Sequence, residues 1–233
     1  MKPWGIVATV VLASAGCGWT SRAVGPVVHE RQVVELDRAE RTSLHLRMGG
    51  GELEVTGGAA PLVEADFAYN VPEWKPSVVH TTAGAESKVE ISQDTSPTVF
   101  GNTENTWKVV VNDARPIELN ARLAAGEARM KIGSLNLRDV EVHIGAGEVD
   151  VDLRGTPTSS YRVRIQGGVG EATVHVPATV AVSATASGGI GEISVTGLEQ
   201  RDGRWINPRA VSSPVTIDLD VRGGVGSIRI VAD

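Results

Sequence analysis

The sequence predicts an all-β protein, a β-solenoid of stacked rungs with a less regular N-terminal β cap region. Three observations support this fold class. A glycine motif recurs along the chain, apolar and polar residues alternate with a period of two around it, and no stretch after residue 16 keeps an apolar stripe at helical spacing. Aromatic residues make up only 4% of the 233 residues, whereas glycine contributes 27. The core is therefore expected to consist of thin layers of valine, isoleucine, leucine and alanine.

Composition and charge exclude several functional classes. A hydrophobic fraction of 41% with 21% charged residues is typical of a packed fold rather than of a disordered chain. The formal net charge of -6 disfavours a nucleic-acid partner, because binding to a phosphate backbone relies on lysine and arginine. A single cysteine allows neither an internal disulfide nor a cysteine-rich zinc site.

Residues 1–16 are predicted to be a lipoprotein signal peptide. Lys2 supplies a positive charge, and residues 4–13 form an apolar run that is too short to span a bilayer. The following Ser-Ala-Gly-Cys resembles the lipobox of bacterial lipoproteins, in which the cysteine is acylated, for example with palmitate, and becomes the mature N-terminus. Cys17 is then a membrane anchor, and Gly18 in place of Asp favours the outer membrane if the cell is Gram-negative. The alternative is an ordinary signal peptide followed by a chance cysteine.

Residues 17–27 are interpreted as the lipidated cysteine and a short tether, because they lack alternation and contain glycine and proline. Residues 28–115 form the predicted N-terminal β region, with turn-rich segments at 70–76 and 93–105. Trp74 and Trp107 are either exposed binding residues or caps over the open end of the core, and capping is favoured because a solenoid must cover its terminal rungs. Strands are expected at 31–36, 43–48, 51–56, 62–69, 77–82, 88–92 and 107–112.

The glycine repeat dominates residues 116–233, the predicted C-terminal β-solenoid. Its shared form is small-x-Gly-Glu-apolar-polar-apolar, and one copy occurs earlier, around Gly51. The spacings between aligned glycines from Gly126 onward are about 21, 23, 21 and 35 residues, within the range of solenoid repeats. Each rung is expected to consist of a strand, a glycine corner and a second strand. The six copies are 49–55, 124–130, 145–151, 168–174, 189–195 and 224–230.

Alternation within the repeat sorts its residues into columns. One column is predicted to point into the core: Leu53, Ala128, Val149, Ala172, Ile193 and Ile228. The neighbouring outward column contains Glu52, Glu127, Glu148, Glu171, Glu192 and Ser227. These glutamates either accept hydrogen bonds from backbone N–H groups in the glycine corners, or Glu127, Glu148, Glu171 and Glu192 form a weak cation ladder. The first interpretation is favoured, because isolated glutamates supply too few oxygens for calcium.

An insertion at 199–213 lengthens the last repeat. It carries Trp205 with Arg201, Arg204 and Arg209. Insertions on one face of a repeat protein often bind partners. We therefore predict a binding surface formed by these four residues.

Three stretches, 49–58, 62–74 and 135–153, together resemble the bacterial toast-rack proteins. This family includes proteins described as adhesins and the C-terminal domain of LiaF-like membrane regulators of the cell-wall stress response. The resemblance implies a β-solenoid with an N-terminal cap region and no catalytic residues. Unlike LiaF-like proteins, this chain contains no membrane helices, which puts transmembrane signalling in doubt.

The residues themselves predict no enzyme, no cofactor and no metal site. The five histidines lack the spacing of a common metal site, and no serine occurs in a nucleophile elbow. The predicted function is therefore a lipid-anchored, non-catalytic binding, adhesion or scaffolding module of the cell envelope, bound to the membrane through Cys17 and to an envelope protein or a cell-wall polymer. Two alternatives are an envelope-stress regulatory partner that acts through protein contacts and, less favoured, a polysaccharide-active enzyme.

Overall fold

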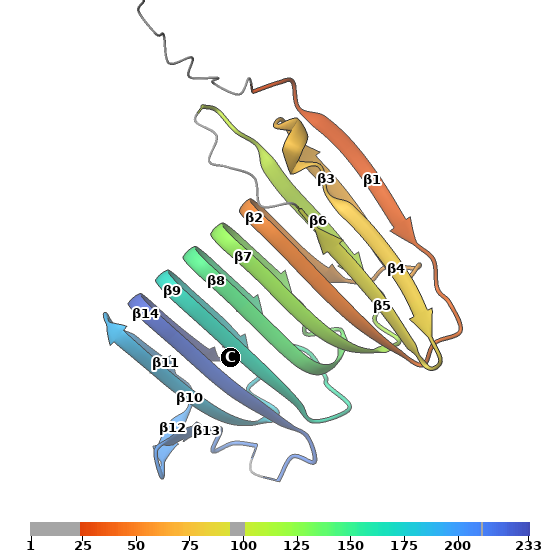
Figure 1. The fold of residues 1–233 in the computed structure, drawn as a ribbon. Coiled ribbons are helices and arrows are strands. Elements are labelled where there is room, and N and C mark those ends of the chain that lie inside the picture. The colour runs from red at the N-terminus through yellow and green to blue at the C-terminus, as the bar shows by residue number, and fades with distance from the viewer. Residues whose placement is uncertain (1–23, 94–100, 211) are drawn as a thin grey trace, which may run out of the picture.

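The computed structural model describes residues 24–93, 101–210 and 212–233, and almost all of its regular structure is β (Figure 1). The predicted signal peptide and Cys17 lie outside the described residues. The elements are β1 (Val28–Val34), β2 (Arg41–Gly57), β3 (Val63–Tyr69), the 3-10 helix η1 (Pro72–Trp74), β4 (Ser77–Ala83), β5 (Glu86–Ser92), β6 (Asn105–Val111), β7 (Pro116–Lys131), β8 (Asn136–Asp152), β9 (Tyr161–Val176), β10 (Ala181–Ile190), β11 (Ile193–Thr196), β12 (Glu199–Arg201), β13 (Arg204–Ile206) and β14 (Thr216–Ala232).

Five long strands form the rungs of the stack. β2, β7, β8, β9 and β14 have 16 or 17 residues each, and each one bends in the middle, so that its two halves run along opposite sides of the stack (Figure 1). Neighbouring rungs pair in parallel, and their bend glycines fall in register: Gly51 with Gly126, Gly126 with Gly147, Gly147 with Gly170, and Gly170 with Gly226. The predicted all-β fold of stacked rungs is confirmed.

Glycine is required at these bends for a steric reason. Gly147 has a φ of 131°, which L side chains rarely adopt. A Cβ atom added there would lie 1.8 Å from the carbonyl oxygen of Gly126 in the next rung. The bend can therefore close against its neighbour only without a side chain.

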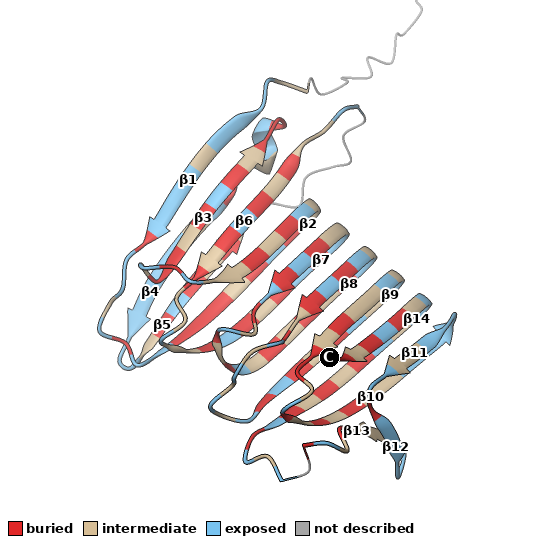
Figure 2. Ribbon diagram, turned by 180° about the vertical axis from the view of Figure 1, so that it is seen from behind, coloured by how far each residue is buried: buried red, intermediate tan, exposed pale blue. Residues whose placement is uncertain are grey.

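The core lies between the two sides of the stack, and burial alternates along every rung (Figure 2). Val151, Val174 and Ile230, in register on β8, β9 and β14, are completely buried. The inward column is correct for Leu53, Ala128, Val149 and Ile228. It is wrong for Ile193, which is 42% exposed, because β11 pairs only with β14 and has no rung beyond it. Ala172 is half-buried.

The N-terminal strands extend both sides of the stack beyond β2. The first half of β2 pairs with β5, which pairs with β4, whereas the second half pairs with β6, followed by β3 and β1. Because β2 also pairs with β7, the sheet continues across the predicted boundary at residues 115 and 116. Trp107 is completely buried, and its ring meets that of Phe67 edge to face with 5.5 Å between the ring centroids. Trp74 is partly buried and packs against the core. Trp107 is therefore a core residue of the cap region and not an exposed binding residue.

The rungs do not follow one another in chain order. β14, the last strand, lies between β9 and β10, with parallel pairing on both sides. The hairpin β12–β13 pairs antiparallel with β10 and covers part of its outer edge. Because Ser227 of β14 pairs with Glu171, it separates Glu171 from the terminal Glu192.

Asp37, in the connection between β1 and β2, joins the cap region to the first rungs. It forms an ion pair with Arg115, accepts a hydrogen bond of 2.5 Å from the hydroxyl of Thr82, and accepts one of 3.0 Å from the backbone N–H of Ala39. Burial raises the pKa of Asp37, but these hydrogen bonds outweigh burial and hold the pKa well below its usual range. The folded state therefore favours the charged carboxylate.

Replacing Asp37 by asparagine is expected to lower the free energy of unfolding at pH 7 by about 1–3 kcal/mol, because charge-assisted hydrogen bonds are lost. Since the folded pKa lies below the unfolded one, this stabilisation is present in full above a pH of about 4 and is lost as the pH falls toward the folded pKa. Urea unfolding of both proteins between pH 7 and pH 2.5 checks the prediction. A difference in stability that stays constant over this range would contradict it.

Candidate binding groove at the bends

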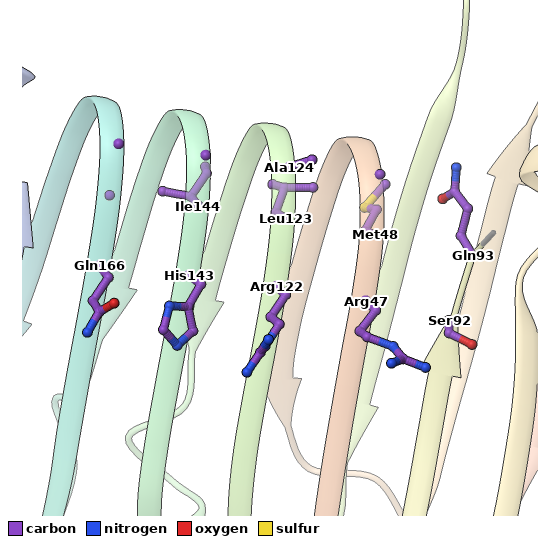
Figure 3. A pocket seen from close by; sticks show the side chains of 14 residues that line it. Arg47, Met48, Ser92, Gln93, Arg122, Leu123, Ala124, His143, Ile144 and Gln166 are labelled. Atoms are coloured by element: carbon purple, nitrogen blue, oxygen red, sulfur yellow. The ribbon is translucent and has the colours of Figure 1, made fainter. Parts of the chain in front are cut away.

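A row of polar side chains crosses four successive rungs just before the bend. Arg47 pairs in register with Arg122, Arg122 with His143, and His143 with Gln166. Figure 3 shows the four side chains side by side on β2, β7, β8 and β9. We call these four residues the basic column. Each of them stands four positions before the bend glycine of its rung.

A groove of about 730 Å³ runs along the basic column. It is open because the second position after the column carries little or no side chain in each rung, namely Gly49, Ala124, Gly145 and Gly168, while Met48, Leu123 and Ile144 form its apolar lining. Ser92 and Gln93 line its end at the cap region (Figure 3). The groove is therefore long enough to follow several rungs.

The groove concentrates positive charge in a protein of net charge -6. Arg47 and Arg122 are direct neighbours on parallel strands, an arrangement that costs stability because like charges repel. Arg47 pairs with Glu90. Arg122 donates from Nε to the side-chain oxygen of Asn120 at 3.2 Å, and in the described part of the chain it forms no ion pair. Arg122 is therefore available to an anionic ligand.

The pKa of His45, which lies two residues before Arg47, is affected by these positive charges. Burial lowers its pKa, and the positive charges of Lys88, Arg47 and Arg122 lower it further, against an opposing effect of Glu90. Burial and the neighbouring cations thus favour the neutral ring of His45.

Carboxylates beside the groove are already paired. Nε of Arg164 donates to Glu141 at 3.0 Å, and Nη2 of Arg164 reaches Asp139 at 3.1 Å. The hydrogen bond from Arg164 holds the pKa of Glu141 below its usual range, although burial opposes it. None of the described residues that line the groove carries a carboxylate. The groove suits an anion and lacks the pair of carboxyl groups that most glycosidases use.

One cluster superficially resembles a catalytic triad. Nε2 of His80 lies 2.9 Å from Oγ of Ser87 and 3.4 Å from Oδ2 of Asp37. A triad needs one ring nitrogen for the serine and the other for the aspartate, whereas here Nε2 faces both. Ser87 is also completely buried. The cluster is therefore structural.

The insertion residues divide into two groups. Trp205 is half-buried and packs against the core. Nε of Arg204 donates a hydrogen bond of 2.5 Å to Oγ of Ser183, and Arg204 forms an ion pair with Asp218. Trp205 and Arg204 both hold the hairpin β12–β13 on the stack. Arg201, which pairs with Glu199 at 3.3 Å, and Arg209 are exposed. The structure does not bring these four residues to the basic column, and a binding role for them stays a prediction.

The glutamate column runs along the opposite side of the bends. Glu127, Glu148 and Glu171 are in register on β7, β8 and β9, and Glu127 pairs with Arg129. Within the described residues, no group of three histidine, cysteine, aspartate or glutamate side chains could hold a metal ion. The described residues also contain no helix long and apolar enough to cross a membrane.

Comparisons with known proteins agree with the fold and the repeat. A model described as the N-terminal domain of toast_rack matches residues 23–175, and a model described as the cell wall-active antibiotics response LiaF, C-terminal, matches residues 124–230. No curated protein matches the chain.

Two solved structures align with most of the chain, and the first of them has the same fold. The first is described as a putative cell adhesion protein from Clostridium sporogenes. It shares 30% identity over 89% of this chain and 100% of its own, with a TM-score of 0.84. The second, a putative adhesin from Bacteroides fragilis, shares 14% identity over 88% of this chain and 97% of its own, with a TM-score of only 0.35.

Proposed function

The chain belongs to the toast-rack family, and from this premise we propose that it is a non-catalytic binding module of the bacterial cell envelope that holds an anionic ligand along the groove. The observation that carries the proposal is the basic column, in which two arginines stand in adjacent rungs beside an open groove. A linear polyanion fits this geometry, because its successive charges can meet successive rungs about 4.8 Å apart. The description of the Clostridium relative as a putative cell adhesion protein is consistent with such a role.

The proposal includes a lipid anchor on Cys17. Gly25, eight positions after Cys17, already donates a backbone hydrogen bond to the fold, so the connection between the cysteine and the fold is short. Acyl chains on Cys17 supply a membrane attachment that the described residues do not provide by a helix. Mass spectrometry of the mature N-terminal peptide tests the anchor: acylation supports it, and a free thiol overturns it.

Removing both groove arginines is expected to weaken polyanion binding. In the Arg47→Ala/Arg122→Ala variant, the dissociation constant for soluble polyphosphate should rise at least about tenfold, because two charge-assisted contacts are lost. Isothermal titration at low and at physiological salt measures this effect, and the affinity of the unaltered protein should fall as salt rises.

The matched control is Arg138→Ala/Arg162→Ala, which removes the same charge from the first halves of β8 and β9, outside the groove. This control should bind polyphosphate nearly as well as the unaltered protein. Equal losses in the two variants would mean that net charge alone attracts the polymer, and the groove would lose its role.

A regulatory partner of the envelope-stress response is the second candidate, favoured by the match of residues 124–230 to the LiaF C-terminal model. In this case the groove would bind an acidic segment of a protein. Cross-linking in cells, with and without wall-active antibiotics, discriminates the two functions. A protein captured in an antibiotic-dependent way favours regulation, whereas captured polymer favours the binding module.

A further inference from the structure

Three apolar side chains project into solvent at the bends of the last rungs. Val169, Val225 and Ile190 are 56%, 46% and 73% exposed. They are direct neighbours, because Val169 pairs with Val225 and Val225 with Ile190. We call these three residues the bend ridge. In the earlier rungs the same row holds only Gly50, Ala125 and Ala146. A contiguous group of exposed β-branched residues is a candidate contact surface.

The chain enters the domain at the same edge of the molecule. The backbone N–H of Gly25 donates to the carbonyl oxygen of Asn70 at 2.8 Å, and the side chain of Asn70 donates to the carbonyl oxygen of Asn102. Asn105, at the start of β6, donates a hydrogen bond to the carbonyl oxygen of Gly50. On β2, Gly50 occupies the position that Val169 occupies on β9. Figure 1 shows the start of β1 and the bends of β2, β7 and β8 at one edge of the stack.

The length of chain before residue 24 limits how far this edge can lie from an anchor. Six residues lie between Cys17 and Val24, and the seven steps from one to the other span at most about 25 Å when fully extended. Ile190 lies five rungs away from Gly50, which is about 24 Å at 4.8 Å per rung. A lipid on Cys17 would therefore hold the chain entry within about 25 Å of the bilayer, and the row of bends, which shares this edge, can lie along the membrane surface.

We propose that the bend ridge lies on the membrane that holds Cys17, with Val169, Val225 and Ile190 in the interfacial layer of the bilayer. This inference rests on the proposed lipid anchor. Narrow glycine bends suit such a contact, because they present the three side chains at the rim of the molecule with no bulky neighbours in the row. Apolar side chains that enter the interface add their burial to the attachment by the acyl chains.

Charge beside the ridge fixes its tilt. On one flank stands Arg222, in register with Gln166 of the basic column and paired with Asp220 at 2.7 Å, and on the other flank stand Glu171 and Glu192. Lipid phosphates repel the second flank, whereas on the first flank Asp220 balances the charge of Arg222. The domain should therefore lean with the basic column toward the headgroups and the glutamate column toward solvent.

Site-specific photo-cross-linking tests the inference in cells that make the full chain. A benzophenone amino acid replaces Val169 or Ile190, and the matched control carries it at Thr158, an exposed position in the turn between β8 and β9 at the opposite edge. After irradiation, mass spectrometry identifies what is attached to the labelled peptide. The same sample shows whether Cys17 is acylated.

Phospholipid adducts are expected at 169 and 190, several-fold more abundant than at 158. Acylated Cys17 without such an excess overturns the ridge contact and leaves the anchor intact. A free thiol at Cys17 overturns the anchor, and in that case lipid adducts at 169 and 190 would still support the ridge, whereas their absence would overturn both. Adducts to a second copy of the chain or to another protein at these positions would replace the membrane with a protein partner and overturn the inference.

Discussion

Replacing Gly147 by alanine is expected to destabilise the protein by more than about 4 kcal/mol, an effect that only a few mechanisms produce. The alanine Cβ would lie 1.8 Å from the carbonyl oxygen and 2.8 Å from the carbonyl carbon of Gly126. Both are backbone atoms of a rung that is itself paired on its other side, so neither can move without separating strands. The midpoint of thermal unfolding, followed by circular dichroism, should fall by more than about 10 °C for a chain of this size.

A second glycine separates the steric effect from backbone strain. Gly84, in the turn between β4 and β5, also has a positive φ of 58°, but a Cβ there meets nothing within 4 Å. Gly84→Ala should therefore cost only about 1–2 kcal/mol, the penalty of the left-handed conformation. Equal losses at the two positions would show that the stack tolerates side chains at its bends, contrary to the packing described above.

The sequence predicts the rungs because two local rules determine them. Alternation assigns Val149 and Val151 to the core, and the recurring glycine locates the bend between the two halves of each strand. Both rules act within one rung and need no knowledge of its neighbours. Ile193 violates the first rule for a reason outside its own segment, since the outer side of β11 has no further rung to cover it.

The basic column lies outside the repeat motif, which begins two residues after it in each rung. An alignment that extends upstream by two residues places Arg47, Arg122 and His143 in one column, four positions before the bend glycine. The sequence alone does not reveal the groove beside these three residues. That space depends on Ala124 and Gly145 standing next to one another in adjacent rungs.

Groove and ridge depend on the same feature of the fold. Small residues near the bends leave space for the groove beside the basic column. At the bends themselves, Val169, Val225 and Ile190 are exposed. The flank residues come in register from rung to rung, so like residues in successive rungs repeat a charge or an apolar group about every 4.8 Å. A surface of this kind suits extended ligands and flat interfaces rather than small compact molecules.

Ending the chain after residue 213 is expected to release everything that follows β9. Sequence order alone would place β10 directly on β9, but in the structure β10 contacts the stack only through β14. Removing β14 deletes Ile217, Leu219 and Ile230, all completely buried, and leaves β10 to β13 without a partner in the stack. Trypsin should then cleave after Arg201, Arg204 and Arg209 many times faster than in the full chain, because local unfolding sets the rate of cleavage.

The control removes an edge strand that no other strand depends on. Deleting residues 28–34 eliminates β1, which pairs only with β3 at the far end of the sheet. Cleavage after Arg201, Arg204 and Arg209 should stay slow in this variant, since β10, β13 and β14 keep their pairing. The prediction is wrong if the chain that ends at residue 213 protects these arginines from trypsin as well as the full chain does. That result would mean that β10 pairs with β9 when β14 is absent, so that β14 is not required to hold β10 on the stack.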